Sequence, residues 1–227
     1  RHARFDGWLI TFLEKELTQP VWKRFKIHTP GKEKRMTDVQ NVAELALVTR
    51  RGDISGFDHQ DLDEFFAELD DIEDENLDFD VDDFTTAFHE TRDALDRVDT
   101  TVLADAAAGE PDDREKRIGV VAGRGSLFTH FYTLWSYVDS LRSLEDLKAL
   151  DVVALGAKYR DFMTAVAALD LGKKRPDELL EGVETEFERL VVRYKLSSVG
   201  ATTDLPLRRA RLEALAAAMS LPIQDQD

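Results

Sequence analysis

Residues 81–102, VDDFTTAFHETRDALDRVDTTV, decide the fold of this chain. Their apolar side chains recur at alternating steps of three and four residues, which is the spacing of one face of an α-helix. We call this face the 81–102 seam; it consists of Val81, Phe84, Phe88, Leu95, Val98 and Val102, with Thr91 in the one remaining position. The acidic side chains lie outside the seam. We therefore predict a single helix of about 33 Å, which is long enough to span a domain.

The same helical spacing continues on both sides of this stretch, and the alternation typical of strands is nearly absent. Further helices are expected over residues 5–17, 21–26, 37–50, 59–69, 127–138 and 151–169, then from Pro176, and finally after Thr203 or Asp204. We therefore predict an all-α fold, a multi-helix bundle of about eight or nine helices with no substantial sheet.

Residues 109–113, GEPDD, form the clearest polar break in this pattern, because glycine and proline both interrupt helices. Two organisations fit it. The chain is either one helical domain, 1–227, or two helical lobes, 1–108 and 114–227, joined by this loop.

Some helix ends are marked by their own sequences. Thr37 and Gln40 have the spacing of a capping box at the start of the 37–50 helix. Gly52 should end that helix, because glycine readily adopts the left-handed conformation found at helix C-termini. Asp58 and Ser126 are expected to cap the helices that follow them.

The composition excludes several classes of protein. The chain has no cysteine, so disulfides, thiolate catalysis and cysteine-ligated metal sites are excluded. No apolar run approaches the roughly 20 residues that a membrane span needs, and the first residues, RHARFDGWLI, lack the pattern of a signal peptide. We expect a cytoplasmic protein with no membrane partner. The opening residues also suggest a piece of a longer protein.

Charge is distributed unevenly along the chain. The net charge is −16, but residues 53–113 alone hold 23 acidic and 2 basic side chains. Residues 1–52 hold 11 basic and 6 acidic side chains, and the remainder is balanced. The acidic block is a solvated face that aids solubility, an adaptation to salt, or else an electrostatic gate or a DNA mimic. The basic N-terminal part is where a phosphate backbone could bind.

Three short basic runs in this part are the candidate nucleic-acid-binding residues. They are Lys23, Arg24 and Lys26; Lys32, Lys34 and Arg35; and Arg50 and Arg51. Each run alone is most simply a solvated face, but three within about 30 residues could form one phosphate-binding patch. Trp22 and Phe25 lie beside the first run, where they could stack on bases or belong to the core. Another basic run, RRAR at 208–211, allows the same two interpretations.

Candidate catalytic residues are few. Arg124 and His130 have about the spacing of the arginine and histidine in all-helical ribonucleases of the HEPN type, so an RNase is one alternative function. Gly125, which follows the arginine, departs from the polar residue usual there. The glycine-rich AGRGS, 122–126, could bind an anion at a helix start. No metal site is expected, because the acidic run DDIEDENLDFDVDD lacks the central glycine and final glutamate of a calcium loop.

Four segments carry a family resemblance over most of the chain. They are RHARFDGWLITFLEKEL at 1–17, EKRMTDVQNVAELALVTRRG at 33–52, GRGSLFTHFYTLWSYVDSL at 123–141 and TTDLPLRRARLEAL at 202–215. In order and character they resemble the C-terminal helical region of the GmrSD-type family, also called domain of unknown function 262. Gln40 and Asn41 depart from the Glu-Leu that the family often has there.

This resemblance implies a function and a missing part. Members of the family are modification-dependent restriction and phage-defence proteins, whose ParB-like N-terminal part carries nucleotide hydrolysis and DNA nicking. The DGQQR-like run of that part is absent here. The resemblance therefore implies a DNA-contacting or regulatory fragment with no catalytic residue and no cofactor of its own, whereas the parent protein would use an NTP and a divalent metal. DNA, in modified form, and the N-terminal catalytic domain would be its partners.

A third alternative is a helical protein-interaction module, in which the 81–102 seam pairs with a second copy to form a homodimer.

Overall fold

The computed structural model describes residues 7–33, 36–56, 59–72, 77–107, 120–121, 128–142, 147–172 and 176–220. Within these ranges the fold is all-α, as predicted, with eleven helices and no strand. The helices are α1 (Trp8–Leu17), α2 (Pro20–Arg24), α3 (Pro30–Glu33), α4 (Thr37–Arg51), α5 (His59–Glu68), α6 (Val81–Ala107), α8 (Phe128–Leu141), α9 (Val152–Ala168), α10 (Pro176–Glu181), α11 (Glu186–Leu196) and α12 (Leu205–Ser220). The prediction of eight or nine helices was too low, because short helices such as α3 have no room for an amphipathic period.

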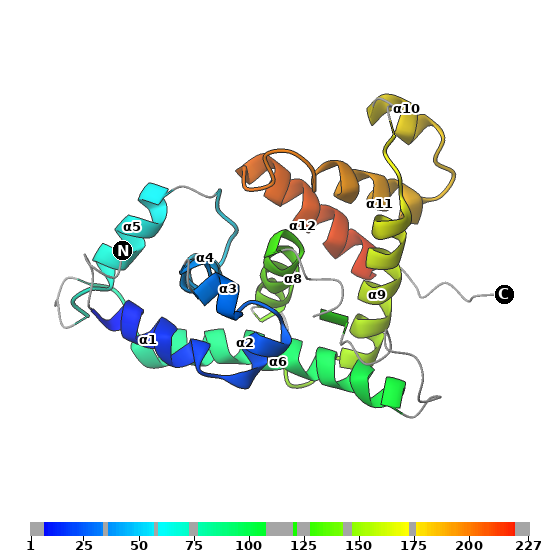
Figure 1. Ribbon diagram of the computed structural model, residues 1–227. Coiled ribbons are helices and arrows are strands. Elements are labelled where there is room, and N and C mark those ends of the chain that lie inside the picture. Colours follow the sequence, from blue (N-terminus) through cyan, green and yellow to red (C-terminus); the bar gives the residue numbers. More distant parts are fainter. Residues whose placement is uncertain are drawn as a thin grey trace.

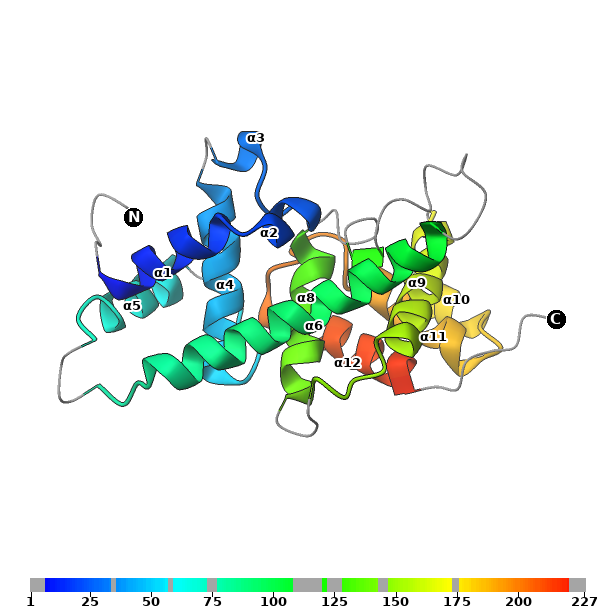
Figure 2. The same cartoon turned by 90° about the horizontal axis from the view of Figure 1, so that it is seen from below.

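Helix α6 is the long axis of the molecule. It runs along one side of the structure, with α1 and α4 beside its first half and α9 beside its last turns (Figures 1 and 2). Helices α4, α8 and α9 all pack against it. The 81–102 seam faces these neighbours: Phe88, Thr91 and Leu95 are fully buried. The seam therefore forms part of the chain's own core.

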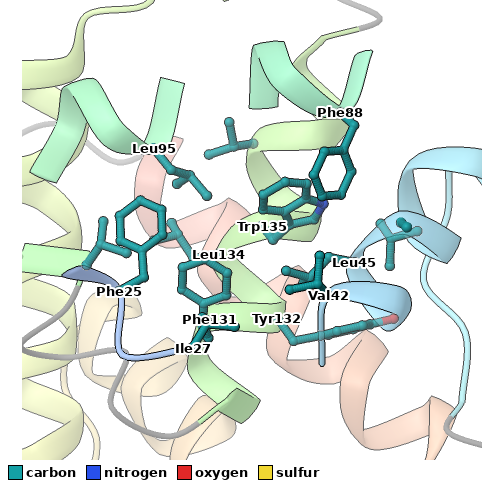
Figure 3. Close-up of a cluster of buried hydrophobic side chains, with 14 of the residues drawn as sticks. Phe25, Ile27, Val42, Leu45, Phe88, Leu95, Phe131, Tyr132, Leu134 and Trp135 are labelled. Carbon is teal, nitrogen blue, oxygen red and sulfur yellow. The ribbon is translucent and has the colours of Figure 1, made fainter. Parts of the chain in front are cut away.

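Aromatic side chains fill the centre of that core. Trp135 of α8 lies 4.8 Å from Phe88 of α6 and 5.9 Å from Trp22 of α2, measured between ring centroids. Figure 3 shows Phe88, Trp135 and Phe131 converging between α6, α8 and α4. Burial of this apolar surface is the main favourable term in folding. Trp22 and Phe25 are completely buried, so they belong to the core and are not free to stack on bases.

One cluster of buried apolar side chains draws on helices from both halves of the sequence. Helix α6, before the polar break, packs on α8 and α9, which follow it. The 109–113 loop itself lies outside the described residues, so the choice between one domain and two lobes stays a prediction.

The start of α4 differs from its prediction. The Thr37–Gln40 capping box is wrong: Thr37 is the first helical residue, and Met36 occupies the N-cap position in the left-handed conformation with φ 54° and no side-chain cap. Asp38 satisfies one of the free N–H groups of the first helical turn instead, because its carboxylate accepts a hydrogen bond from the Val39 N–H at 2.9 Å. The predicted end is confirmed, since Gly52 has φ 67° and its N–H donates to the Val48 carbonyl. The predicted caps Asp58 and Ser126 lie outside the described residues.

No helix in the described ranges contains a segment sufficiently long and apolar to cross a lipid bilayer.

Candidate nucleic-acid interface

The predicted phosphate-binding residues separate into two groups in space. Lys34 and Arg35 lie outside the described residues. Of the others, four belong to α2, α3 and the turn between them, whereas Arg50 and Arg51 lie in the last turn of α4. Helix α4 begins just after α3 and rises about 20 Å before it reaches these arginines. The described residues therefore do not form a single patch.

The two arginines at the end of α4 both form ion pairs with acidic side chains. Arg50 donates to the Glu68 carboxylate at 3.0 Å and to the Asp78 carbonyl at 2.8 Å. Arg51 donates to Asp61 at 3.4 Å. The acidic block 53–113 thus supplies counter-ions for these arginines, which leaves less positive charge here for a phosphate.

The other group contains three lysines that we call the basic corner: Lys23, Lys26 and Lys32. The Lys32 ammonium donates to the backbone carbonyl of Lys26 at 2.6 Å, which holds these two residues side by side. None of the three makes an ion pair with an acid in the described part of the chain. Neighbouring Arg24 differs, because it pairs with Asp96.

Buried neighbours fix the direction of the basic corner. Phe25 and Ile27 are buried on either side of Lys26, which is exposed and has φ 57°. The backbone then turns back, and the N–H groups of Ile27 and His28 both donate to the Trp22 carbonyl. The apolar side chains thus anchor the turn while the lysine points to solvent.

A hydrogen bond between side chains ties this turn to α4. The His28 ring nitrogen Nδ1 lies 2.7 Å from the buried carboxylate of Asp38. Burial lowers the pKa of Lys32, and the nearby Asp38 charge opposes that shift. Asp38 is therefore part of the scaffold, and its negative charge is shared between His28 and the corner.

The RRAR run of α12 is not a basic surface. Arg208 and Arg211 are 5% and 1% exposed. Arg208 donates to the Glu44 carboxylate at 2.7 Å, and Arg211 donates to the Ser197 and Thr202 carbonyls of the α11–α12 turn. Both guanidinium groups are therefore engaged in contacts within the fold. Arg209 of the same run is exposed and pairs with Asp53.

The buried carboxylate of Glu16 was not predicted from the sequence. Glu16 accepts hydrogen bonds from Arg92 at 2.9 Å, His89 at 2.8 Å and the Trp22 indole at 3.3 Å. A signal was present, because Glu16 follows Leu9 and the other apolar positions of α1 at the seven-residue helical step. A charged residue on an apolar helical face predicts a buried partner.

A second buried carboxylate joins three helices. Asp139 of α8 accepts the hydroxyl of Thr49 at 3.0 Å and that of Thr91 at 3.1 Å. Burial raises the pKa of Asp139, and Arg142 together with the two threonines opposes the shift. Thr91, the one polar position of the seam, is therefore a hydrogen-bond donor to α8.

The proposed RNase pair is only half described. Arg124 lies outside the described residues. His130 stacks on Tyr194, and its Nδ1 lies 3.0 Å from the tyrosine hydroxyl. Burial lowers the pKa of His130 to about 4, with further lowering by the charges of Arg211 and Lys195. A histidine with such a pKa is neutral near pH 7 and is a poor proton donor. The pairing of His130 with Arg124 stays a prediction.

One groove lies on the surface between α11 and α12, with a volume of about 520 Å³. Leu190, Leu196, Ala214 and Ala217 supply apolar lining, and Glu186, Arg193 and Glu213 are charged residues at the same groove.

Within the described ranges, no three His, Asp or Glu side chains are grouped so that they could hold a metal ion.

The seam no longer offers a dimer interface, because its described central residues are buried within one chain. A homodimer through another surface stays a prediction.

Comparison with protein-family models, with curated proteins and with solved structures found no match to this chain.

Proposed function

We propose that this chain is a helical module that contacts the phosphates of DNA through its basic corner, Lys23, Lys26 and Lys32. It binds and positions DNA and carries no catalytic group of its own. Lys34 and Arg35, which follow Lys32 by two and three residues in the sequence, remain further candidates for phosphate contact. The arginines at the end of α4 play a smaller part.

The observation that supports the proposal is the unequal pairing of the cations. Arg24, Arg50 and Arg51 each have an acidic partner, whereas the three lysines of the basic corner have none among the described residues. A phosphate that meets Lys23 or Lys26 has no ion pair to displace among the described residues, and one that meets Lys32 competes with a neutral carbonyl. A phosphate that meets a paired arginine must compete with a carboxylate. A phosphate should therefore bind at the basic corner at lower cost than at Arg24, Arg50 or Arg51.

The family resemblance supplies the wider setting of this proposal. The four resembling segments suggest a cytoplasmic, modification-dependent restriction protein of phage defence. In that setting the module would deliver modified DNA to a ParB-like catalytic domain, which would use an NTP and a divalent metal to nick it. Nucleotide hydrolysis by this chain alone would contradict the assignment.

Binding to duplex DNA at varied salt tests the proposal. We expect fluorescence anisotropy to show an affinity that falls steeply between about 50 and 200 mM salt, because each phosphate contact releases counter-ions. The double change Lys23→Gln/Lys26→Gln should weaken binding and reduce the slope of log affinity against log salt by about one for each lost contact.

The double change Arg160→Gln/Arg193→Gln is the matched control, because it removes the same charge from exposed residues of α9 and α11. It should leave the slope nearly unchanged. Equal effects of the two double changes would mean that net charge alone governs binding, and the basic corner would lose its role.

A further inference from the structure

Methionine is an unfavourable residue for the backbone conformation and the N-cap position that Met36 has in the fold. Among the described non-glycine residues, only Lys26 and Met36 have positive φ angles. The left-handed conformation brings Cβ close to the backbone, and glycine or asparagine adopts it at much lower cost. Met36 has φ 54° at the N-cap of α4, where it also makes no side-chain cap. A serine, asparagine or glycine would serve the helix better.

The side chain of Met36 gains little from burial. It is 40% exposed and is one of four large apolar side chains that the described surface leaves exposed; the others are Val153, Val199 and Leu205. Both the backbone and the side chain of Met36 are therefore in an unfavourable state. Local strain of this kind is retained where the surrounding structure and a function require it.

Met36 also lies close to the basic corner. Its N–H donates to the Glu33 carbonyl at 3.0 Å, so it is held against the end of α3, one residue beyond Lys32. The Lys32 ammonium in turn reaches back to Lys26. Helix α3 projects from the body at the start of α4 (Figure 2), so Lys32 of α3 and Met36 at the N-cap of α4 lie at the same projection.

We infer that Met36 is an apolar wedge that enters a base step of duplex DNA while Lys26 and Lys32 hold the adjacent phosphates. This inference rests on the proposed function. Apolar wedges, methionine among them, partly unstack a base step and kink the duplex, and flanking cations compensate for the cost. The left-handed backbone at Met36 sets the direction of its Cα–Cβ bond, and the flexible thioether side chain can adapt to the shape of a base step.

A single exposed methionine fits DNA better than a lipid surface. Helices that lie on membranes present a continuous apolar face opposite their cations. The described residues that flank Met36 in the sequence, Glu33 and Thr37, are charged or polar, and Phe25 and Ile27 are buried in the core. The apolar area is thus that of one side chain, which matches a base step.

Two substitutions test the wedge, Met36→Gly and Met36→Asn. Both residues suit positive φ, so both should raise the melting temperature or leave it unchanged. Both should weaken binding to duplex DNA about tenfold, since the contact area of a buried methionine is lost. The salt dependence should stay the same, because no phosphate contact is removed. A duplex carrying a donor and an acceptor dye at its ends should show bending by wild type and less bending by either variant.

Val199→Gly is the control, because it removes an exposed apolar side chain from the α11–α12 turn, and it should leave DNA affinity unchanged. Absence of wild-type binding would overturn the proposed function itself. Wild-type binding with unchanged affinity of both Met36 variants would overturn only the wedge. A lower melting temperature in both variants would show that Met36 serves the fold. Loss of binding to vesicles of about 30% phosphatidylserine, with DNA binding intact, would replace the wedge by a membrane contact.

Discussion

Arg208 and Glu44 form a buried ion pair across 164 residues of sequence. The guanidinium nitrogen lies 2.7 Å from the carboxylate, and the two side chains are 5% and 7% exposed. Arg208 also donates to the Ser55 carbonyl at 3.1 Å and lies over the Tyr132 ring, 3.9 Å from its centroid. One side chain thus joins α12 to α4, to the segment after it and to α8.

Removal of Arg208 should destabilise the fold strongly. Arg208→Met breaks a buried ion pair by removing one of its members, which typically costs about 3 to 5 kcal/mol in the free energy of unfolding. Arg209→Met is a matched control one residue away, because Arg209 pairs with Asp53 on the surface at 3.1 Å and should cost less than about 1 kcal/mol. Urea denaturation followed by circular dichroism measures both. Equal costs would contradict the buried pair.

Replacing Thr91, the polar residue of the 81–102 seam, by an apolar residue should lower the stability of the fold. A heptad pattern predicts that Thr91→Val stabilises the chain. The Thr91 hydroxyl donates to the buried carboxylate of Asp139, so we expect a loss of about 1 to 2 kcal/mol instead. Thr91→Ser keeps the donor and should retain the hydrogen bond. Thermal unfolding of the two variants decides the sign, and a higher melting temperature for Thr91→Val would refute the role of the hydroxyl.

Gly7 should not tolerate a side chain. An added Cβ would collide with the backbone of Asp70, including its carbonyl oxygen, and the backbone cannot move aside at low energetic cost. The Gly7 N–H also donates to the Asp70 carboxylate at 2.9 Å, so displacement would break a contact between α1 and the end of α5. Gly7→Ala should cost about 1 to 3 kcal/mol.

Gly31→Ala provides the comparison, because nothing lies within 4 Å of its Cβ position and it is inside α3. It should leave stability unchanged or raise it by up to about 1 kcal/mol. A similar loss for both alanines, measured in the same urea titration, would count against the close approach at Gly7.

His130 should make stability depend on pH. Its pKa is about 4 in the folded protein, against 6.5 for an unperturbed histidine. Between these values the unfolded chain binds more protons, so the free energy of unfolding falls as pH falls. The loss should reach about 3 kcal/mol once the pH is below the folded pKa.

His130→Asn keeps a polar atom near Tyr194 but cannot titrate, so its stability should fall less between about pH 7 and pH 4.5. Asp139 acts in the opposite direction, because its pKa is raised and its contribution to stability is lost as pH rises. It is present in both proteins and cancels in the difference. Parallel pH profiles for wild type and His130→Asn would show that the histidine titrates normally.

Local pattern accounts for much of the fold. The periods at 37–50, 81–102 and 151–169 predicted α4, α6 and α9 to within a few residues. Helix α3 is not among the helices expected from the sequence, because Pro30 and Gly31 together favour a loop, yet proline suits the first turn of a helix. The start of α4 was misassigned because the sequence shows which residues can cap a helix, and tertiary contacts choose which one does.

The sequence by itself determined that the chain is helical, which faces are apolar, and that cations concentrate in its first 52 residues. These properties depend on neighbours within a few residues. Only the tertiary structure decided which cations remain for a ligand. Arg50, Arg51, Arg208 and Arg211 are bound by groups outside their own helices. Lys23, Lys26 and Lys32 have no acid paired with them in the described ranges. The physical reason is that an ion pair depends on distances of a few ångströms, and such distances between residues remote in sequence exist only after the helices have packed.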